Sequence, residues 1–127
     1  MSFLQGFKVL DLASVGPAAR ASRILADYGM EVIKVAPVSG KGQKQTEPVY
    51  HAYGAGRGTR RIRVDLQSAA GRDTVYRLAR ASDVLIESFR PGVAQRIGVG
   101  YEQVREHNPR IVYCSTSGYG QQGPCAQ

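Results

Sequence analysis

The chain has 127 residues, a net charge of +7 and a composition in which 43% of the residues are hydrophobic. This length suits one globular domain, and no apolar run approaches the roughly 18 residues that a membrane-spanning helix needs, so we expect no membrane partner. The N-terminus lacks the pattern of a secretory signal, and two cysteines (Cys114 and Cys125) make neither a disulfide framework nor a metal site, so we expect a reduced cytoplasmic protein without metal.

Strands and helices alternate along the first part of the chain. A short apolar strand is predicted over Lys8–Ala13, and Pro17 is well placed to start a helix with apolar side chains at helical spacing. Gly29 is a natural end for this helix, and a second strand is predicted over Glu31–Val35. The inward-facing residues of the helix are predicted to be Ala18, Ala21, Ile24, Leu25 and Tyr28.

The regular pattern stops between Ala36 and Gly58, which we expect to form a long loop, and a loop of this length in a compact domain is usually functional or disordered. From Lys41 to Arg63 the chain has six cations against one anion, which leaves a local charge of +5. Such an excess favours nucleic acid, an acidic membrane surface or a phosphate-bearing small molecule, although it is also typical of a solvated face. No nucleic-acid-binding motif accompanies it, so we expect no nucleic-acid partner.

The alternation resumes after this loop. The predicted elements are a strand (Arg60–Leu66), a helix capped by Ser68 (Ala69–Ala81), a strand (Asp83–Ser88), two short helices (Val93–Ile97 and Tyr101–His107) and a last strand (Ile111–Thr116). In the longer helix, Val75, Leu78 and Ala79 are predicted to face inward. Short apolar strands separated by amphipathic helices are typical of an α/β fold with a Rossmann-like open, mostly parallel sheet and flanking helices.

Glycines mark two loops that follow predicted strands. After the first strand the sequence reads SVGPAAR, which lacks the glycine fingerprint of dinucleotide-binding proteins and argues against an ordinary dehydrogenase. The last strand runs into a loop with Gly118, Gly120 and Gly123. Such a loop lets the backbone approach a ligand closely, at the end of a strand where α/β sheets bind their ligands.

The stretch ASDVLIESFRPGVAQRIGVGYEQVREHNPRIVYCSTSGYGQQGP (residues 81–124) resembles the family III coenzyme A transferases. This family, also called CaiB/BaiF, includes the α-methylacyl-CoA racemases. The segments GFKVLDLASVGPAARASRILADYGMEVIKV and RGTRRIRVDLQSAAGRD resemble further blocks of the family, so the resemblance covers nearly the whole chain. It implies that residues 1–127 form the N-terminal part of a large Rossmann-like domain that binds coenzyme A, without its remainder and without the family's small domain. It also implies an interlocked homodimer of the full-length form, or a complementing chain.

By this resemblance, Ser88, Phe89 and Arg96 fall where family members contact coenzyme A. An aromatic ring directly after a strand can pack against adenine, and an arginine on the next helix can donate charge-assisted hydrogen bonds to a phosphate. Phe89 is equally compatible with a core position, and Arg96 with a surface charge. Gly16 is expected to border the acyl-thioester pocket, or else only to shape the entry into the helix.

Arg57 and Arg60 match a second block that contacts coenzyme A in the family, although Thr59 stands where a lysine is usual. The two reactions that the family implies use residues beyond this sequence. Transferases use an aspartate nucleophile and pass through a covalent intermediate, whereas racemases use a histidine and an aspartate as acid and base on the α-carbon. Both sets follow the SGYGQQGP motif in the family, so we predict no catalytic residue within residues 1–127.

No acidic or histidine side chain in the chain is a convincing substitute for these catalytic groups. Asp11 and Asp65 are expected to accept backbone hydrogen bonds, while Glu87 ends a strand without an assigned role and His107 is expected at the surface. The predicted function is therefore a family III coenzyme A transferase acting on acyl-CoA and carboxylic acids. The alternatives are an α-methylacyl-CoA racemase and a catalytically incomplete fragment that binds coenzyme A.

Overall fold

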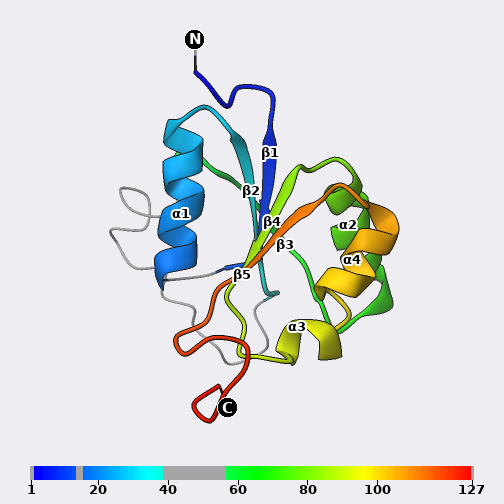
Figure 1. Cartoon of the computed structure of the whole chain (residues 1–127). Helices are drawn as coiled ribbons and strands as arrows, with labels where there is room; N and C mark the ends of the chain where they lie inside the picture. Colours follow the sequence, from blue (N-terminus) through cyan, green and yellow to red (C-terminus); the bar gives the residue numbers. More distant parts are fainter. Residues whose placement is uncertain (1, 14–15, 39–56, 127) are drawn as a thin grey trace.

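One open sheet of five strands forms the centre of the molecule in the computed structural model, which describes residues 2–13, 16–38 and 57–126 (Figure 1). The strand order is β3-β2-β1-β4-β5, and every neighbouring pair is parallel. The central strand β1 (Lys8–Asp11) lies between β2 (Glu31–Ala36) and β4 (Val84–Glu87). The edges are β3 (Arg60–Arg63) and β5 (Val112–Ser115). The predicted Rossmann-like α/β sheet is confirmed.

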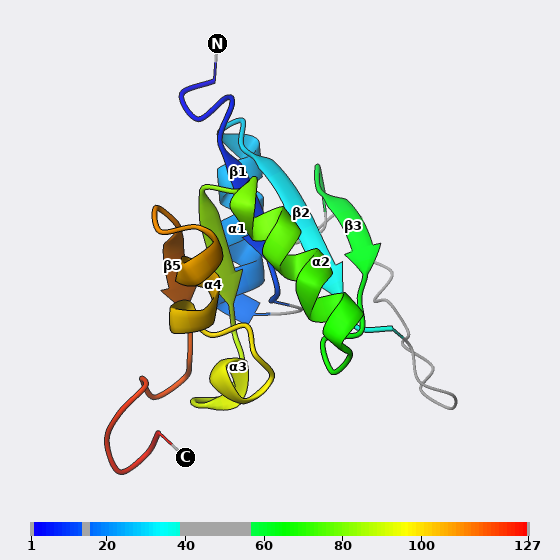
Figure 2. The ribbon, with the colours of Figure 1, turned by 90° about the vertical axis from the view of Figure 1, so that its right-hand side faces the viewer.

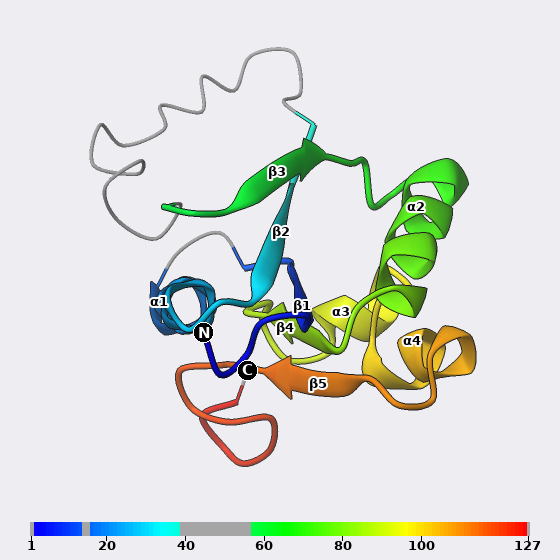
Figure 3. The same ribbon diagram turned by 90° about the horizontal axis from the view of Figure 1, so that it is seen from above.

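Helices cover both faces of the sheet. Helix α1 (Gly16–Asp27) lies on one face, whereas α2 (Ala69–Arg80), α3 (Val93–Arg96) and α4 (Tyr101–His107) lie on the other (Figure 3). Figure 2 looks onto the second face and shows α2 running along the sheet with α4 beside it near β5. The order of strands and helices agrees with the predicted order, and the bounds of α4 agree to the residue.

The core has two parts, one on each side of the sheet. On the side of α2 and α4, Leu10 and Leu85 of the central strands pack against Val75, Val99 and Val104. The smaller part, beneath α1, includes Val9, Val32 and Ile86 from the three central strands, together with Ala13, Ala18 and Met30. Alternate residues of β1 thus enter opposite parts of the core, as expected for a strand that is covered on both faces.

The predicted buried face of α1 is wrong in part. Ala21 is exposed, Ile24 and Tyr28 are 45% and 56% exposed, and the buried residues are Ala18, Ala19 and Ser22. The hydroxyl of Ser22 donates a hydrogen bond to the buried carboxylate of Asp11, and the small alanines leave room for close approach to the sheet. A polar tertiary contact has therefore set the rotation of this helix against the pattern of its apolar side chains.

The prediction for α2 is confirmed. Ser68 caps the helix by accepting a hydrogen bond from the N–H of Gly71 at 2.9 Å, and Val75 and Ala79 are buried. A side chain at position 71 would collide with the carbonyl of Asp65, since a Cβ atom there would come within 1.8 Å of that oxygen. The glycine therefore lets the start of α2 pack tightly against the turn that follows β3.

The connections define where a ligand would bind. The helix that follows β1 lies on one face of the sheet, and the helices that follow β4 lie on the other (Figure 3). Between β1 and β4 the direction of the crossovers reverses, and in open α/β sheets ligands occupy the crevice outside the carboxyl ends of the strands at such a point. Of the predicted basic segment, residues 41–56 lie outside the described part of the chain.

No helix among the described residues combines the length and the apolar character that crossing a membrane requires.

Candidate functional site

A pocket of about 770 Å³ opens at the carboxyl ends of β4 and β5. One wall is the segment 88–93 with Arg96, which leaves β4 and forms α3. The other wall is the segment 117–120 with Cys125 and Ala126, which follows β5. This volume lies in the range of small-molecule sites, and the pocket lies at the carboxyl ends of the strands, the edge of an open α/β sheet at which ligands bind.

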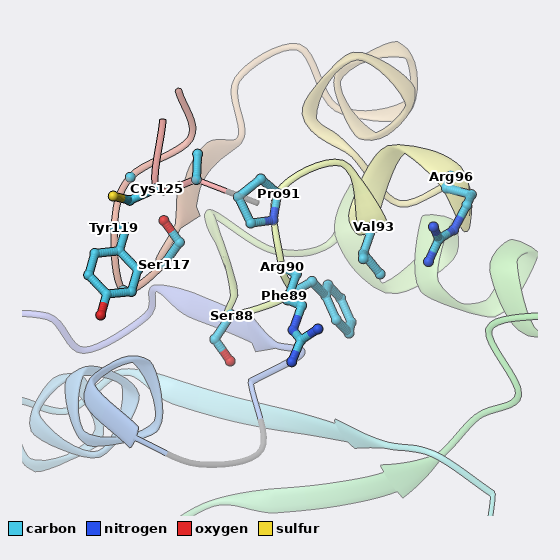
Figure 4. A pocket seen from close by; sticks show the side chains of 12 residues that line it. Ser88, Phe89, Arg90, Pro91, Val93, Arg96, Ser117, Tyr119 and Cys125 are labelled. Carbon is cyan, nitrogen blue, oxygen red and sulfur yellow. The ribbon is translucent and has the colours of Figure 1, made fainter. Parts of the chain in front are cut away.

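The wall after β4 carries two cations and an aromatic ring. Figure 4 shows the ring of Phe89 between the guanidinium groups of Arg90 and Arg96 in that view. Phe89 is half-buried and packs against the core, while both arginines are exposed. Among the described residues, no carboxylate forms an ion pair with either arginine. Their donors remain available to an anionic ligand.

The wall after β5 is a loop of glycines and small polar residues. Gly120 and Gly123 have φ angles of +84° and +109°, a left-handed conformation that other residues rarely adopt. Ser117, Tyr119 and Cys125 contribute side chains to the pocket (Figure 4). The sequence predicted the glycines of this loop and missed the three side chains, as it missed Arg90.

Beneath the pocket lies the buried carboxylate of Glu87. Its Oε2 accepts a hydrogen bond from the backbone N–H of Phe89 at 2.7 Å, and its Oε1 accepts one from the hydroxyl of Ser115. The side-chain amide of Gln121 donates to Ser115 Oγ at 2.8 Å. The last residues of β4 and β5 and the loop after β5 thus share one chain of hydrogen bonds.

Tyr113 lies near this carboxylate on the covered side of β5. Burial raises the pKa of its hydroxyl well above the ordinary value, and the negative charge of Glu87 raises that pKa further. The hydroxyl donates a hydrogen bond to the carbonyl of Val99 at 2.9 Å. Tyr113 is therefore a neutral donor that links β5 to the segment between α3 and α4.

A second buried carboxylate, Asp11, ends β1. As predicted, it accepts a backbone hydrogen bond, from the N–H of Ala13 at 2.7 Å. It also accepts hydrogen bonds from the hydroxyl of Ser22 and, at 2.6 Å, from the ammonium group of Lys34 on β2. Because Asp11 is paired with a buried ammonium group and hydrogen-bonded to α1, its environment is that of a structural carboxylate.

The other candidate acid-base groups also have structural contacts. Asp65 accepts a hydrogen bond from the N–H of Gln67 at 3.0 Å, as expected. His107 is only half exposed, because its ring stacks on Tyr76 at 4.1 Å and its Nδ1 lies 2.9 Å from Arg80. Within the described ranges, no three His, Cys, Asp or Glu side chains come together as a metal site.

The structure brings together Ser88, Phe89 and Arg96 of the predicted site, all of which line the pocket. Gly16 lies at the start of α1 with a φ of +79°, beyond the carboxyl end of β1, and does not line the pocket.

Arg57 and Arg60 lie elsewhere. Arg57 pairs with Asp27 at 3.0 Å and Arg60 with Glu31 at 3.1 Å. Arg60 begins β3 and Glu31 begins β2, so these pairs lie toward the amino ends of the parallel strands, whereas the pocket lies at the carboxyl ends. Both side chains are exposed and do not line the pocket. Arg57 precedes the predicted strand and Arg60 begins it, so the sequence already placed both residues at its amino end.

Comparison with known proteins gives consistent matches over almost the whole chain. Residues 4–127 match the model of CoA-transferase family III. The succinate–glutarate CoA-transferase of Agrobacterium fabrum is 37% identical over 97% of this chain and 34% of its own length. The human α-methylacyl-CoA racemase is 35% identical over 94% of this chain and 29% of its own length.

The crystal structure of a CaiB/BaiF family protein from Brucella suis has a TM-score of 0.88 at 32% identity, over 98% of this chain and 36% of that one. The chain therefore spans about a third of the length of these relatives. Sequence and structure agree, and the chain belongs to CoA-transferase family III.

Proposed function

We propose that the polypeptide that carries this chain is a coenzyme A transferase, and that the pocket at the carboxyl ends of β4 and β5 binds coenzyme A or its thioesters. The observation that carries the proposal is the pair of arginines without ion-pair partners in the described chain, Arg90 and Arg96, on either side of Phe89 in Figure 4. Family membership supplies the reaction class.

The chemistry of the pocket suits this ligand. Coenzyme A carries phosphate groups and an adenine ring. Guanidinium groups bind phosphates through paired, charge-assisted hydrogen bonds, and an aromatic ring offers adenine a flat apolar surface. Ser88 and the glycine-containing loop add polar and backbone groups at close range. The pocket is large enough for part of the ligand, so we assign it the phosphate-bearing and adenine portion.

The described residues supply binding rather than bond making. Asp11 and Glu87 are buried and already hydrogen-bonded, and His107 is engaged with Tyr76 and Arg80. By the family resemblance, an aspartate beyond residue 127 attacks the acyl-CoA carbonyl and carries the acyl group and then coenzyme A as covalent intermediates. We assign residues 1–127 to the N-terminal part of the large domain of such an enzyme.

The test uses the complete polypeptide that carries residues 1–127. Incubation with succinyl-CoA and a panel of dicarboxylic acids should give new CoA thioesters, detected by mass spectrometry. Loss of this activity on mutation of the pocket arginines would link the reaction to the site. Absence of coenzyme A binding in calorimetry would contradict the proposal.

A racemase is the second candidate, because the human α-methylacyl-CoA racemase is nearly as similar to this chain as the transferase of Agrobacterium fabrum. The two reactions differ in what happens at the α-carbon. A racemase exchanges the α-proton of a 2-methylacyl-CoA with solvent and needs no acceptor acid. Deuterium uptake in D₂O without an acceptor would favour the racemase, whereas thioester transfer without such uptake would favour the transferase.

The remaining part of the proposal concerns assembly and location. We propose that the complete polypeptide forms a homodimer, as the family resemblance implies, and that it is located in the cytoplasm. Light scattering on the purified polypeptide would give its mass in solution. A monomer that catalyses transfer would contradict the dimer without affecting the proposed reaction.

A further inference from the structure

The carboxylate of Glu87 occupies an unusual place for a charged group. It ends β4 directly opposite Ser115, which ends β5, and it is 3% exposed. Its hydrogen-bond donors among the described residues are a backbone N–H and a hydroxyl, both of them neutral. Burial of a charge costs free energy unless the charge is paired and hydrogen-bonded, so a carboxylate with hydrogen bonds but no cation among the described residues is costly to bury.

The two oxygens of Glu87 bond to the two segments that lead into different walls of the pocket. Oε2 accepts from the N–H of Phe89, two residues along the chain, and so fixes the turn by which the backbone leaves β4. Oε1 accepts from the hydroxyl of Ser115 at the root of the loop after β5.

The hydroxyl of Ser115 extends the connection outward. It donates its proton to Glu87 and accepts a hydrogen bond from the side-chain amide of Gln121 at 2.8 Å. Gln121 belongs to the loop whose residues 117–120, Cys125 and Ala126 line the pocket. A hydroxyl has one proton to donate. Because Ser115 donates this proton to Glu87, its oxygen accepts from Gln121, and the carboxylate thus sets the direction of both hydrogen bonds.

We propose that Glu87 is a positioning residue for ligand binding, which holds the two loops of the pocket at a fixed separation through Phe89 on one side and Ser115 and Gln121 on the other. The proposal rests on the proposed function, in which the ligand is coenzyme A. Glu87 is no catalytic residue in this account, because its oxygens are buried and occupied and do not line the pocket.

The variants change Glu87 and Ser115 separately, each in the complete polypeptide. Glu87→Gln keeps the size of the side chain but replaces one acceptor by a donor, so the hydroxyl of Ser115 loses its acceptor. Ser115→Ala removes the hydroxyl, whereas Ser115→Thr keeps a hydroxyl at the same position. Glu102→Gln is the matched control, because Glu102 is exposed on α4 and pairs with Arg105 away from the pocket.

Calorimetry with coenzyme A gives the first readout. Glu87→Gln and Ser115→Ala should each raise the Kd about fivefold, which corresponds to the net contribution of one lost hydrogen bond. The double variant should resemble one single variant rather than reach the roughly 25-fold of independent effects, because both remove the same connection. Ser115→Thr and the control should stay near the wild-type value.

Hydrogen exchange without ligand gives the second readout. In Glu87→Gln, amides of residues 117–126 should exchange faster while those of β1 and β2 keep their protection, which a general loss of stability would not produce.

Unchanged affinity and exchange in Glu87→Gln, or independent effects in the double variant, would overturn the proposal. If Glu87→Gln does not fold, the two Ser115 variants test the proposal instead. Equal affinities of Ser115→Ala and Ser115→Thr for coenzyme A would then overturn the proposal. If the wild type does not bind coenzyme A, the proposed function fails, and the exchange measurement still tests the coupling of the loops.

Discussion

Two buried carboxylates end the neighbouring central strands β1 and β4, and their surroundings differ. Asp11 and Glu87 are 0% and 3% exposed, and each accepts a hydrogen bond from the N–H two residues further on and from a serine hydroxyl. Asp11 has in addition the ammonium group of Lys34 at 2.6 Å. Glu87 has only neutral donors among the described residues.

The two carboxylates differ in which parts of the molecule their hydrogen bonds connect. The partners of Asp11 lie just after β1, on α1 and on β2, so its charge is neutralised within the fold. The partners of Glu87 lead to the two loops of the pocket. One carboxylate therefore holds a helix against the sheet, and the other joins the parts that would surround a ligand.

The largest expected effect concerns stability at Asp11. Lys34→Met removes the only ammonium group at this buried carboxylate among the described residues, and an uncompensated buried charge costs about 3–5 kcal/mol of the free energy of unfolding. Urea and thermal denaturation of the complete polypeptide would measure the loss. The matched control is Lys8→Met, because Lys8 lies 4.0 Å from Glu31 in an exposed pair that contributes at most about 1 kcal/mol. Equal effects of the two variants would contradict the structural assignment of Asp11.

The next effect concerns ligand affinity. Arg96→Ala and Arg90→Ala should each weaken coenzyme A binding by about 1.5–3 kcal/mol, the contribution of a hydrogen bond to a charged group. Calorimetry at several salt concentrations would test this loss of affinity, since contacts between arginine and phosphate weaken as the salt concentration rises. Arg105→Ala serves as control, because Arg105 pairs with Glu102 at 3.0 Å on α4. An unchanged affinity in Arg96→Ala would remove this residue from the site.

A smaller effect should appear at alkaline pH. The pKa of Tyr113 is raised in the folded state, so the native protein holds this proton after the unfolded chain has released it at about pH 10. Stability that depends on Tyr113 is thus fully present below about pH 10 and falls as the pH rises above it. Tyr113→Phe should flatten this fall in denaturation curves measured from pH 9 upward. A fall of the same steepness in the variant would show that other groups cause it.

The smallest effect is expected at Arg57 and Arg60. Because these side chains form exposed ion pairs with Asp27 and Glu31, their replacement by alanine should cost no more than about 1 kcal/mol of stability. We expect the affinity for coenzyme A to fall less than in Arg96→Ala. If either variant bound coenzyme A more weakly than Arg96→Ala, the family-based prediction for these two residues would be supported over the pocket described above.

The sequence was most informative where local rules decide the structure. Helix α4 has the predicted bounds and Ser68 caps α2 as predicted, because capping and apolar spacing act within a few residues. The buried face of α1 was wrong in part, because Ser22 turns toward Asp11 and leaves Ile24 and Tyr28 in solvent. That contact joins residues of two elements, and no periodicity within the helix could reveal it.

The sequence predicted residues of one wall of the candidate site and missed the side chains of the other. Family resemblance located Ser88, Phe89 and Arg96, which lie in one segment after β4. The opposite wall with Tyr119 depends on the pairing of β4 with β5, which brings two distant loops together. The connection from Glu87 to Ser115 depends on the same register, so it became visible only in three dimensions.

Hydrogen exchange of the complete polypeptide with and without coenzyme A tests the central claim most directly, because it shows where the ligand lies. If the pocket at the carboxyl ends of β4 and β5 binds coenzyme A, the ligand should slow exchange in residues 88–96 and 117–126 and leave the exposed surface of α4 unchanged. Binding that protects other segments and leaves both of these loops unaffected would contradict the account.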